Sequence, residues 1–352
     1  MVKNRKLTLT IFCLLFLSSC ATTKPFRDTN GNIIKGSIAA LETIKINGIK
    51  IQLLIRGENV TNPVILFLHG GPGAPEMALT NYYYQKKLEK DFILVHYDQR
   101  GAGKSFSKDI PPETMTINHI VEDTRDVSKY LLKRFGKDKI ILMGHSWGTI
   151  IGVYCINKYP KLYDYYIGIG QVVNMHENEL LSYNYTLDRA KQTNNRIAVG
   201  QLEKIGIPPY RSLKDGNIQR KWLMKLGGSI YNGNSFSDVK EGRKTNKEYT
   251  LVDWIFYWLP GLKYSNKMLQ GELNNVNLFE SVKSFDVPIY LLLGRHDYQA
   301  PSEIAEKYFN LIKAPNKKLY CFEQSAHMIH FEEPEEFIKT IKEISTYTSF
   351  YK

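Results

Sequence analysis

The stretch Lys139-Ile140-Ile141-Leu142-Met143-Gly144-His145-Ser146-Trp147-Gly148-Thr149-Ile150-Ile151 decides the fold. An apolar run typical of a buried strand leads into Gly-x-Ser-x-Gly at positions 144–148, and a helical pattern follows as far as Pro160. A serine in such a strand–turn–helix is held in a strained conformation with positive φ, so only glycine-sized residues fit two places away on either side. The pattern therefore predicts that Ser146 is presented at a sheet edge as a nucleophile.

Strands and helices alternate on both sides of this stretch. Asn47-Gly48 joins two strand patterns as a hairpin, and fully apolar runs indicate strands buried on both faces. This alternation predicts a doubly wound, mostly parallel sheet with right-handed crossovers. The expected strands are 37–46, 49–55, 63–68, 92–97, 139–144, 163–173, 287–294 and 318–322, and the expected helices include 117–135 and 302–312.

The alternation stops between residues 174 and 284. This segment has helical patterns, many aromatic residues and no clear strand of the sheet. We interpret it as a helical cap inserted into one sheet domain, which consists of residues 37–173 and 285–352.

A serine hydroxyl is a poor nucleophile until a base takes its proton and an acid orients that base. The strand at 289–293 ends in Gly-Arg-His-Asp at Asp297, and the strand at 319–322 leads to His327. Both side chains therefore come from carboxyl ends of strands, where the chain order Ser, Asp, His is expected. Asp297 is favoured as the acid and His327 as the base. His296 and His330 are the alternative bases, and Glu323 is the alternative acid.

Stabilising an oxyanion requires two N–H donors. One is expected from Trp147, directly after the nucleophile. The second is expected from His69-Gly70-Gly71-Pro72-Gly73, where Gly70 and Gly71 allow a close approach of the backbone.

Five motifs together resemble those of the prolyl iminopeptidases, α/β-hydrolases that remove N-terminal proline and, in broader members, other residues. The motifs are His69–Gly73, Asp98-Gln99-Arg100-Gly101-x-Gly103-x-Ser105, Gly144–Gly148, Gly294-Arg295-x-Asp297 and His327. The resemblance implies an α/β-hydrolase fold with Ser146 as nucleophile, Asp297 as acid, His327 as base, and Gly71 and Trp147 as oxyanion donors.

Two departures concern specificity. His145 stands where strict members often have glycine, and no glutamate follows the aromatic run Trp254–Trp258. We therefore expect an aminopeptidase for short peptides with N-terminal proline or another small or apolar residue. Glu177 and Glu179 are candidates to bind the substrate ammonium. A carboxylesterase or amide hydrolase for small acyl substrates is the alternative. A tethered binding protein without activity belongs to a third class.

The first nineteen residues have the plan of a secretory signal, because Lys3, Arg5 and Lys6 precede an apolar run from Leu7. The sequence Leu17-Ser18-Ser19-Cys20 resembles the bacterial lipobox, in which the cysteine is lipidated. We therefore expect an exported lipoprotein, tethered through Cys20 to the outer face of the cell membrane or to an outer membrane. Residues 20–36 would form a polar spacer.

The 352 residues carry a formal net charge of +12, or +9 without the three basic residues of the signal. The lysines are scattered, so we expect no nucleic-acid partner. Cys155 and Cys321 lie in apolar contexts and are interpreted as small hydrophobic residues. With no Cys/His cluster of zinc spacing, no metal and no cofactor are expected. The oligomeric state is left open.

Overall fold

The computed structural model describes residues 21–79, 83–231 and 246–350. The predicted signal peptide and Cys20 lie outside these residues. Within them, one eight-stranded sheet has the order β1-β2-β4-β3-β5-β6-β7-β8. The first two strands pair antiparallel with their neighbours, and all pairs from β4 to β8 are parallel. The strands are β1 (Ile38–Ile46), β2 (Ile49–Gly57), β3 (Val64–Leu68), β4 (Ile93–Tyr97), β5 (Ile140–His145), β6 (Tyr163–Ile169), β7 (Ile289–Gly294) and β8 (Lys317–Phe322).

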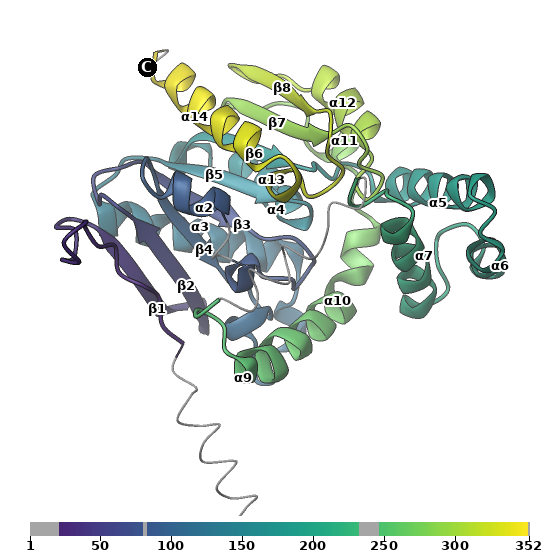
Figure 1. Cartoon of the computed structure of the whole chain (residues 1–352), viewed down its shortest axis with the longest axis horizontal. Coiled ribbons are helices and arrows are strands. Elements are labelled where there is room, and N and C mark those ends of the chain that lie inside the picture. The colour runs from purple at the N-terminus through teal and green to yellow at the C-terminus, as the bar shows by residue number, and fades with distance from the viewer. Residues whose placement is uncertain (1–20, 80–82, 232–245, 351–352) are drawn as a thin grey trace, which may run out of the picture.

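Helices cover both faces of the sheet (Figure 1). Leu66 and Leu142 belong to the core that includes α3 (Ile117–Phe135), α4 (Trp147–Lys158) and α12 (Ser302–Leu311). Their neighbours Ile65 and Ile141 belong to a second core, formed with α2 (Tyr83–Leu88) and α14 (Pro334–Phe350). Alternate residues of one strand thus enter opposite cores, which is why the central strands read as unbroken apolar runs.

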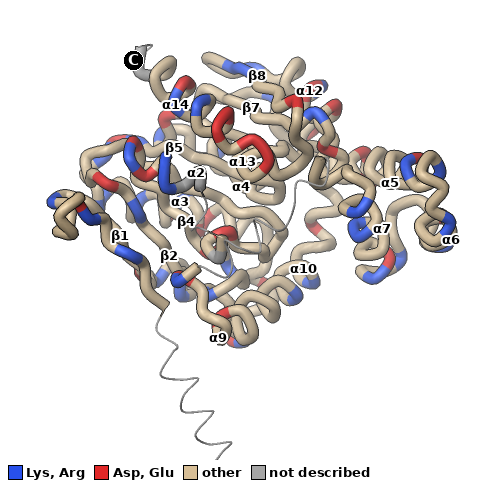
Figure 2. The backbone as a smooth tube through the Cα atoms, viewed as in Figure 1, with Lys and Arg blue, Asp and Glu red and all other residues tan. Residues whose placement is uncertain are grey.

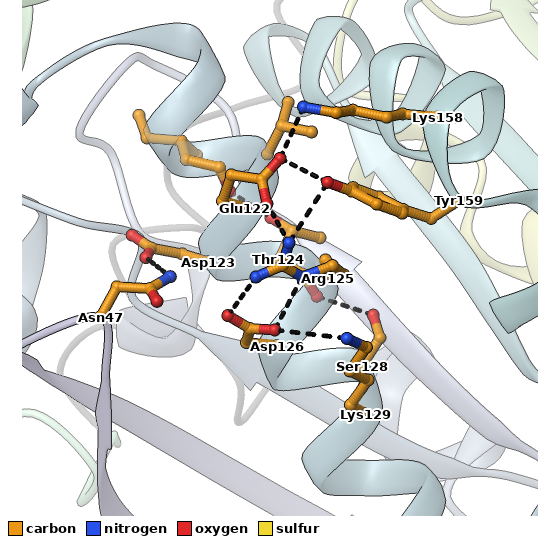
Figure 3. A network of polar contacts seen from close by, with 12 residues as sticks. Asn47, Glu122, Asp123, Thr124, Arg125, Asp126, Ser128, Lys129, Lys158 and Tyr159 are labelled. Carbon is orange, nitrogen blue, oxygen red and sulfur yellow. Dashed lines mark hydrogen bonds and ion pairs between the residues drawn. The ribbon is translucent and has the colours of Figure 1, made fainter.

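The β1–β2 hairpin is fastened to α3. Asn47 has φ 46° in the turn, and its side-chain amide donates to Oδ1 of Asp123, 2.8 Å away. Figure 3 shows this contact beside a surface network in which Arg125 bonds to Asp126 and Lys158 bonds to Glu122. The turn that the sequence marks by Asn-Gly is therefore held by a polar contact as well as by its backbone.

Between β6 and β7 the described residues add no strand to the sheet. α5 and α7 pack together with α6 at one side of the molecule, whereas α10 runs across the end of the sheet (Figure 1). The cap elements are α5 (Met175–Gln192), α6 (Arg196–Ile205), α7 (Leu213–Lys225), α9 (Leu251–Asp253), a π-helical turn (Trp254–Trp258), α10 (Leu259–Asn274) and α11 (Leu278–Ser281).

One expected strand is too long. The pattern at 163–173 predicts a strand to Val173, but β6 ends at Ile169. Gly170 follows with φ 56°, a left-handed conformation that an extended strand does not contain. The chain turns there toward the sheet edge that carries Ser146.

No helix among the described residues has the length and apolarity needed to cross a bilayer. Cys155 is buried, Cys321 is partly buried, and neither forms a disulfide.

Candidate active site

Ser146 occupies a sharp turn between β5 and α4, with φ 53° and ψ −120°. A Cβ on Gly144 would lie 2.6 Å from the carbonyl oxygen of Gly148, and one on Gly148 would lie 2.1 Å from that of Leu68. Both positions therefore admit only glycine. The Ser146 N–H donates to the carbonyl of Ile169 at 2.9 Å, so the neighbouring strand β6 holds the strained turn.

Asp297 and His327 meet at the same edge. Asp297 follows β7, His327 follows β8, and Nδ1 of the histidine lies 2.7 Å from Oδ2 of the aspartate. The other carboxylate oxygen accepts from the backbone N–H groups of Gln299 and Ala300 at 2.8 and 2.9 Å. Both side chains are buried. Because an ionised carboxylate only accepts, Nδ1 carries the proton and Nε2 presents a lone pair.

Gly170 connects this pair to the serine. Its neighbour Ile169 accepts the Ser146 N–H, and a Cβ on Gly170 would lie 3.0 Å from Nδ1 of His327 and 3.3 Å from Oδ2 of Asp297. Nε2 of His327 is buried and hydrogen-bonds to none of the described residues, Ser146 included. In unliganded enzymes this bond is often long, and it tightens when substrate binds.

The alternative residues lie in other environments. His296 stacks on Tyr231, with ring centroids 3.7 Å apart. Glu323 is exposed and bonds to Arg295, which lowers the pKa of its carboxyl to about 2. His330 is fully buried, and burial lowers its pKa to about 4. The imidazole that pairs with the Asp297 carboxylate is that of His327.

The glycine-rich loop after β3 lies against the serine turn. A Cβ on Gly70 would be 3.3 Å from Cβ of Ser146, and Gly71 has φ 123°. Gln99 fixes this arrangement, because its amide nitrogen donates to the carbonyl of His69 and its amide oxygen accepts from the indole N–H of Trp147. The sequence marked Gln99 only as part of a motif; the structure gives it a positioning role.

Comparison with known proteins agrees with this arrangement. The profile of the alpha/beta hydrolase fold family matches residues 63–334. A probable aminopeptidase of Bacillus subtilis is 38% identical over 87% of this chain and 96% of its own length. A proline iminopeptidase of Heyndrickxia coagulans is 27% identical over 85% of this chain and 96% of its own.

The chain belongs to the α/β-hydrolase family.

The predicted fold is confirmed, and the protein is a serine hydrolase of the prolyl iminopeptidase type. The structure of the proline iminopeptidase-related protein of Thermus thermophilus superimposes with a TM-score of 0.58 and 17% identity, over 87% of this chain and 96% of that one. The structure of a thermophilic esterase of Thermogutta terrifontis gives the same TM-score and identity, over 89% of this chain and 98% of that one. At such identities the likeness shows the fold alone.

This α/β-hydrolase has a cavity of about 420 Å³ beside the serine. Ser146, Gly71 and Trp147 line it together with residues of α5, α7 and α10. Of the two candidate ammonium ligands, Glu179 lines the cavity, where its carboxylate pairs with Arg220. Glu177 does not line it, and its carboxylate accepts from the side chain of Asn174 at the start of α5.

A second acidic–histidine pair lies beneath the site. Nδ1 of His145 is 2.7 Å from Oε1 of Glu76, and Nε2 is 3.2 Å from the backbone carbonyl of His327. Burial alone would lower the pKa of His145, but the Glu76 carboxylate raises it above its ordinary value. Burial alone would raise the pKa of Glu76, but the charge on His145 holds it well below its ordinary value. With acceptors on both sides, His145 is the imidazolium.

The sequence did not reveal this pair, although His145 stood out as a departure from strict relatives. Nε2 of His330 lies 3.3 Å from Oε2 of Glu76, so one carboxylate serves two imidazoles. One carboxylate oxygen of Glu76 and one ring nitrogen each of His145 and His330 lie within 4.8 Å of one another. These three atoms could also serve as ligands of a metal ion. However, the 2.7 Å contact between Glu76 and His145 is a hydrogen-bond distance.

Proposed function

We propose that the protein is a serine aminopeptidase that releases proline or another small or apolar residue from the N-terminus of short peptides. The observation that carries the proposal is the 2.7 Å contact between Asp297 and His327, next to the strained turn that presents Ser146. It is supported by two relatives, one named as a probable aminopeptidase and 38% identical, the other named as a proline iminopeptidase and 27% identical.

In this mechanism Ser146 Oγ attacks the carbonyl carbon of the N-terminal residue while Nε2 of His327 takes the hydroxyl proton. Asp297 fixes the tautomer of His327 and stabilises the imidazolium that forms. The imidazolium then protonates the leaving amine, and the peptide C–N bond breaks. A water molecule, deprotonated by His327, hydrolyses the remaining ester and restores the Ser146 hydroxyl.

The oxyanion of each tetrahedral intermediate is assigned to the N–H groups of Gly71 and Trp147. α4 begins at Trp147, so the N–H of this residue lies in the first turn, where a helix has no internal acceptor for it. Both residues line the cavity beside Ser146. Removing one such donor in serine hydrolases costs roughly 10²–10³ in rate.

The substrate ammonium is assigned to Glu179, the candidate that lines the cavity. Arg220 already pairs with this carboxylate, so a substrate must displace or share the guanidinium. That pairing is also the observation that favours the second candidate function, an esterase or amide hydrolase for small acyl substrates. Such substrates bring no ammonium and leave the ion pair intact.

The deciding experiment compares kcat/KM for prolyl-, alanyl- and leucyl-arylamides with their N-acetylated forms and with aryl acetates. An aminopeptidase loses most of its kcat/KM on N-acetylation, and Glu179→Gln should remove that discrimination whereas Glu177→Gln should not. If the acetates alone are hydrolysed, the esterase function replaces the aminopeptidase.

We also propose that the protein is an exported lipoprotein, tethered through acyl chains on Cys20. Support comes from the leader and the lipobox-like sequence 17–20. Mass spectrometry of the mature N-terminus should find an acylated cysteine in the membrane fraction. A free Cys20 in a soluble fraction would contradict the tether.

A further inference from the structure

One short stretch of the cap exposes large apolar side chains in succession. Of the thirteen large hydrophobic residues exposed among those described, five fall between residues 251 and 259. None of the five lines the cavity. Exposed apolar residues that occur singly are ordinary, but a contiguous group marks an interaction surface. The members of this apolar patch are Leu251, Ile255, Phe256, Tyr257 and Leu259.

The patch cannot turn inward, because the other side of the same segment is fixed to the core. Trp254 is buried in a cluster with Tyr249 and Leu54 of β2. Asp253 bonds to the N-cap Thr250 and pairs with Lys104, 3.1 Å away. The segment therefore places a charge pair on its inner side and apolar groups on its outer side, the reverse of an ordinary surface helix.

The start of the described chain lies beside this segment. The backbone N–H of Thr22 donates to the carbonyl of Lys247 at 3.0 Å. Lys247 precedes the patch by four residues, and Thr22 follows the proposed lipid-bearing Cys20 by two residues, at most about 7 Å of extended chain. Figure 1 shows this start of the chain and α9 at the same end of the molecule. A lipid tether at residue 20 would hold the patch against a membrane.

Cationic side chains continue the apolar face. Ile255, Leu259, Lys263 and Lys267 follow one another at intervals of four, a spacing that keeps side chains near one face of a helix. Lys263 and Lys267 are exposed. Figure 2 shows basic residues on α10, the helix that begins at Leu259. Such a pattern suits acyl chains next to anionic head groups.

We propose that the apolar patch docks into the surface of an anionic lipid bilayer, with Lys263 and Lys267 at the head groups. This surface goes beyond the hydrolytic site and orients it. α10 starts in the patch, and its later residue Gln270 lines the cavity. At a rise of about 1.5 Å per residue, Gln270 lies roughly 16 Å along the helix from Leu259. Docking would thus hold the cavity at a fixed height above the lipid.

The test uses the full chain on vesicles of phosphatidylglycerol and phosphatidylcholine whose acyl chains carry bromine. Leu251→Cys and Ile197→Cys, each combined with Cys321→Ser, receive the same fluorophore. Ile197 on α6 is the matched control, since it is 68% exposed and Leu251 is 65% exposed. We expect bromolipid to quench the label at 251 severalfold more strongly than that at 197. Aqueous iodide should quench in the opposite order.

Two variants separate the contributions of the patch. Phe256→Ser together with Leu259→Ser should reduce quenching at position 251 to the level at 197. Lys263→Glu with Lys267→Glu should reduce the quenching at position 251 on vesicles that contain phosphatidylglycerol, but not on vesicles of phosphatidylcholine alone. Both should keep the far-ultraviolet circular dichroism and the thermal unfolding midpoint of the unaltered protein, which report folding.

Equal quenching at the two positions would overturn the proposal. So would iodide protection at 251 that grows with protein concentration without quenching by bromolipid, because a second copy of the chain would then be the occupant. Loss of catalytic activity bears only on the proposed function, because quenching needs no turnover.

Discussion

At the scale of single residues, each oxygen of Asp297 has its own task. Oδ1 accepts two backbone N–H groups and fixes the carboxylate, and Oδ2 faces Nδ1 of His327. In Asp297→Asn the amide oxygen can keep the backbone contacts, but the amide nitrogen then faces Nδ1 and imposes the wrong tautomer. We expect kcat to fall by about 10⁴ with little loss of stability.

Steady-state kinetics on an arylamide, with thermal unfolding alongside, checks this prediction. Glu323→Gln is the matched control, because Glu323 follows the neighbouring strand β8 but is exposed and paired with Arg295. If it lowered kcat as much as Asp297→Asn, the acid would be assigned to the wrong carboxylate.

His145 predicts a pH dependence. The pKa of His145 is higher in the folded protein than its ordinary value of about 6.5. The stability that the protonated imidazole gives to the fold is therefore complete below that value and is lost as the pH rises through the raised pKa. Loss of the proton removes one of the two donors that hold Glu76 and the backbone of His327. The carboxylate of Asp297 also raises the pKa of His145 through its negative charge, and the imidazole of His330 faces the Glu76 carboxylate. We expect kcat to decline at alkaline pH.

The pH profile of kcat for His145→Gln checks the role of this proton. Glutamine does not titrate, so the variant should be slower near neutral pH and lack the alkaline decline. An unchanged decline in this variant would assign it to another group. Glu76→Gln is the companion variant, since it removes the charge that raises the pKa of His145.

The sequence could point to the residues after each strand, because the order of parallel strands brings their carboxyl ends to one edge. It could not point to Glu76, which lies 69 residues before His145 and belongs to no pattern. Nor does sequence spacing reveal that Gly170 wedges between the serine turn and His327, since this depends on where the next strand ends.

At the scale of elements, α3 holds together the β1–β2 hairpin and the motif Asp98–Ser105 that follows β4. Asp123 of α3 accepts from Asn47 and from the buried guanidinium of Arg100, at 2.8 and 2.9 Å on the latter side. Asp123→Asn would leave that guanidinium without its counter-charge. Breaking one partner of a buried pair costs about 3–5 kcal/mol, and we expect the free energy of unfolding to drop accordingly.

Urea denaturation compares this variant with Asp126→Asn, on the same helix. Asp126 pairs with Arg125 in the partly exposed network of Figure 3, where such pairs contribute about 1 kcal/mol or less. Similar losses in the two variants would contradict the distinction between buried and exposed pairs.

Elements with strong periodicity were predicted well. The amphipathic pattern at 117–135 coincides with α3, and the apolar run before Ser146 coincides with β5 apart from its edges. The pattern at 163–173 failed because Val172 and Val173 are apolar and buried without being part of β6. Apolarity reports burial, whereas the strand ends at a backbone conformation that only Gly170 signals.

At the scale of the whole molecule, the cap is joined to the catalytic loops through α10. Asn266 donates to the carbonyl of Pro72, in the loop assigned to the oxyanion, and Ser265 donates to that of Gly101. These contacts link an insertion to the two motif loops beside Ser146. Periodicity located the cap from its lack of strands, but these contacts depend on polar groups that no sequence pattern marks.

Asn266→Ala should therefore loosen the Gly71 loop without unfolding the cap, whose helices keep their apolar contacts. We expect kcat/KM to fall about tenfold, equivalent to about 1.4 kcal/mol of transition-state stabilisation.

The loss should appear in kcat, because the oxyanion forms only after substrate has bound. Asn275→Ala is the control, since that amide donates to Gly271 of α10, at 2.9 Å, rather than to a loop beside the serine. A loss confined to KM would instead place Asn266 among the groups that bind substrate, which the position of its side chain on the cavity wall allows. Comparing kcat and KM for both variants therefore decides whether α10 acts on the oxyanion loop or on the substrate.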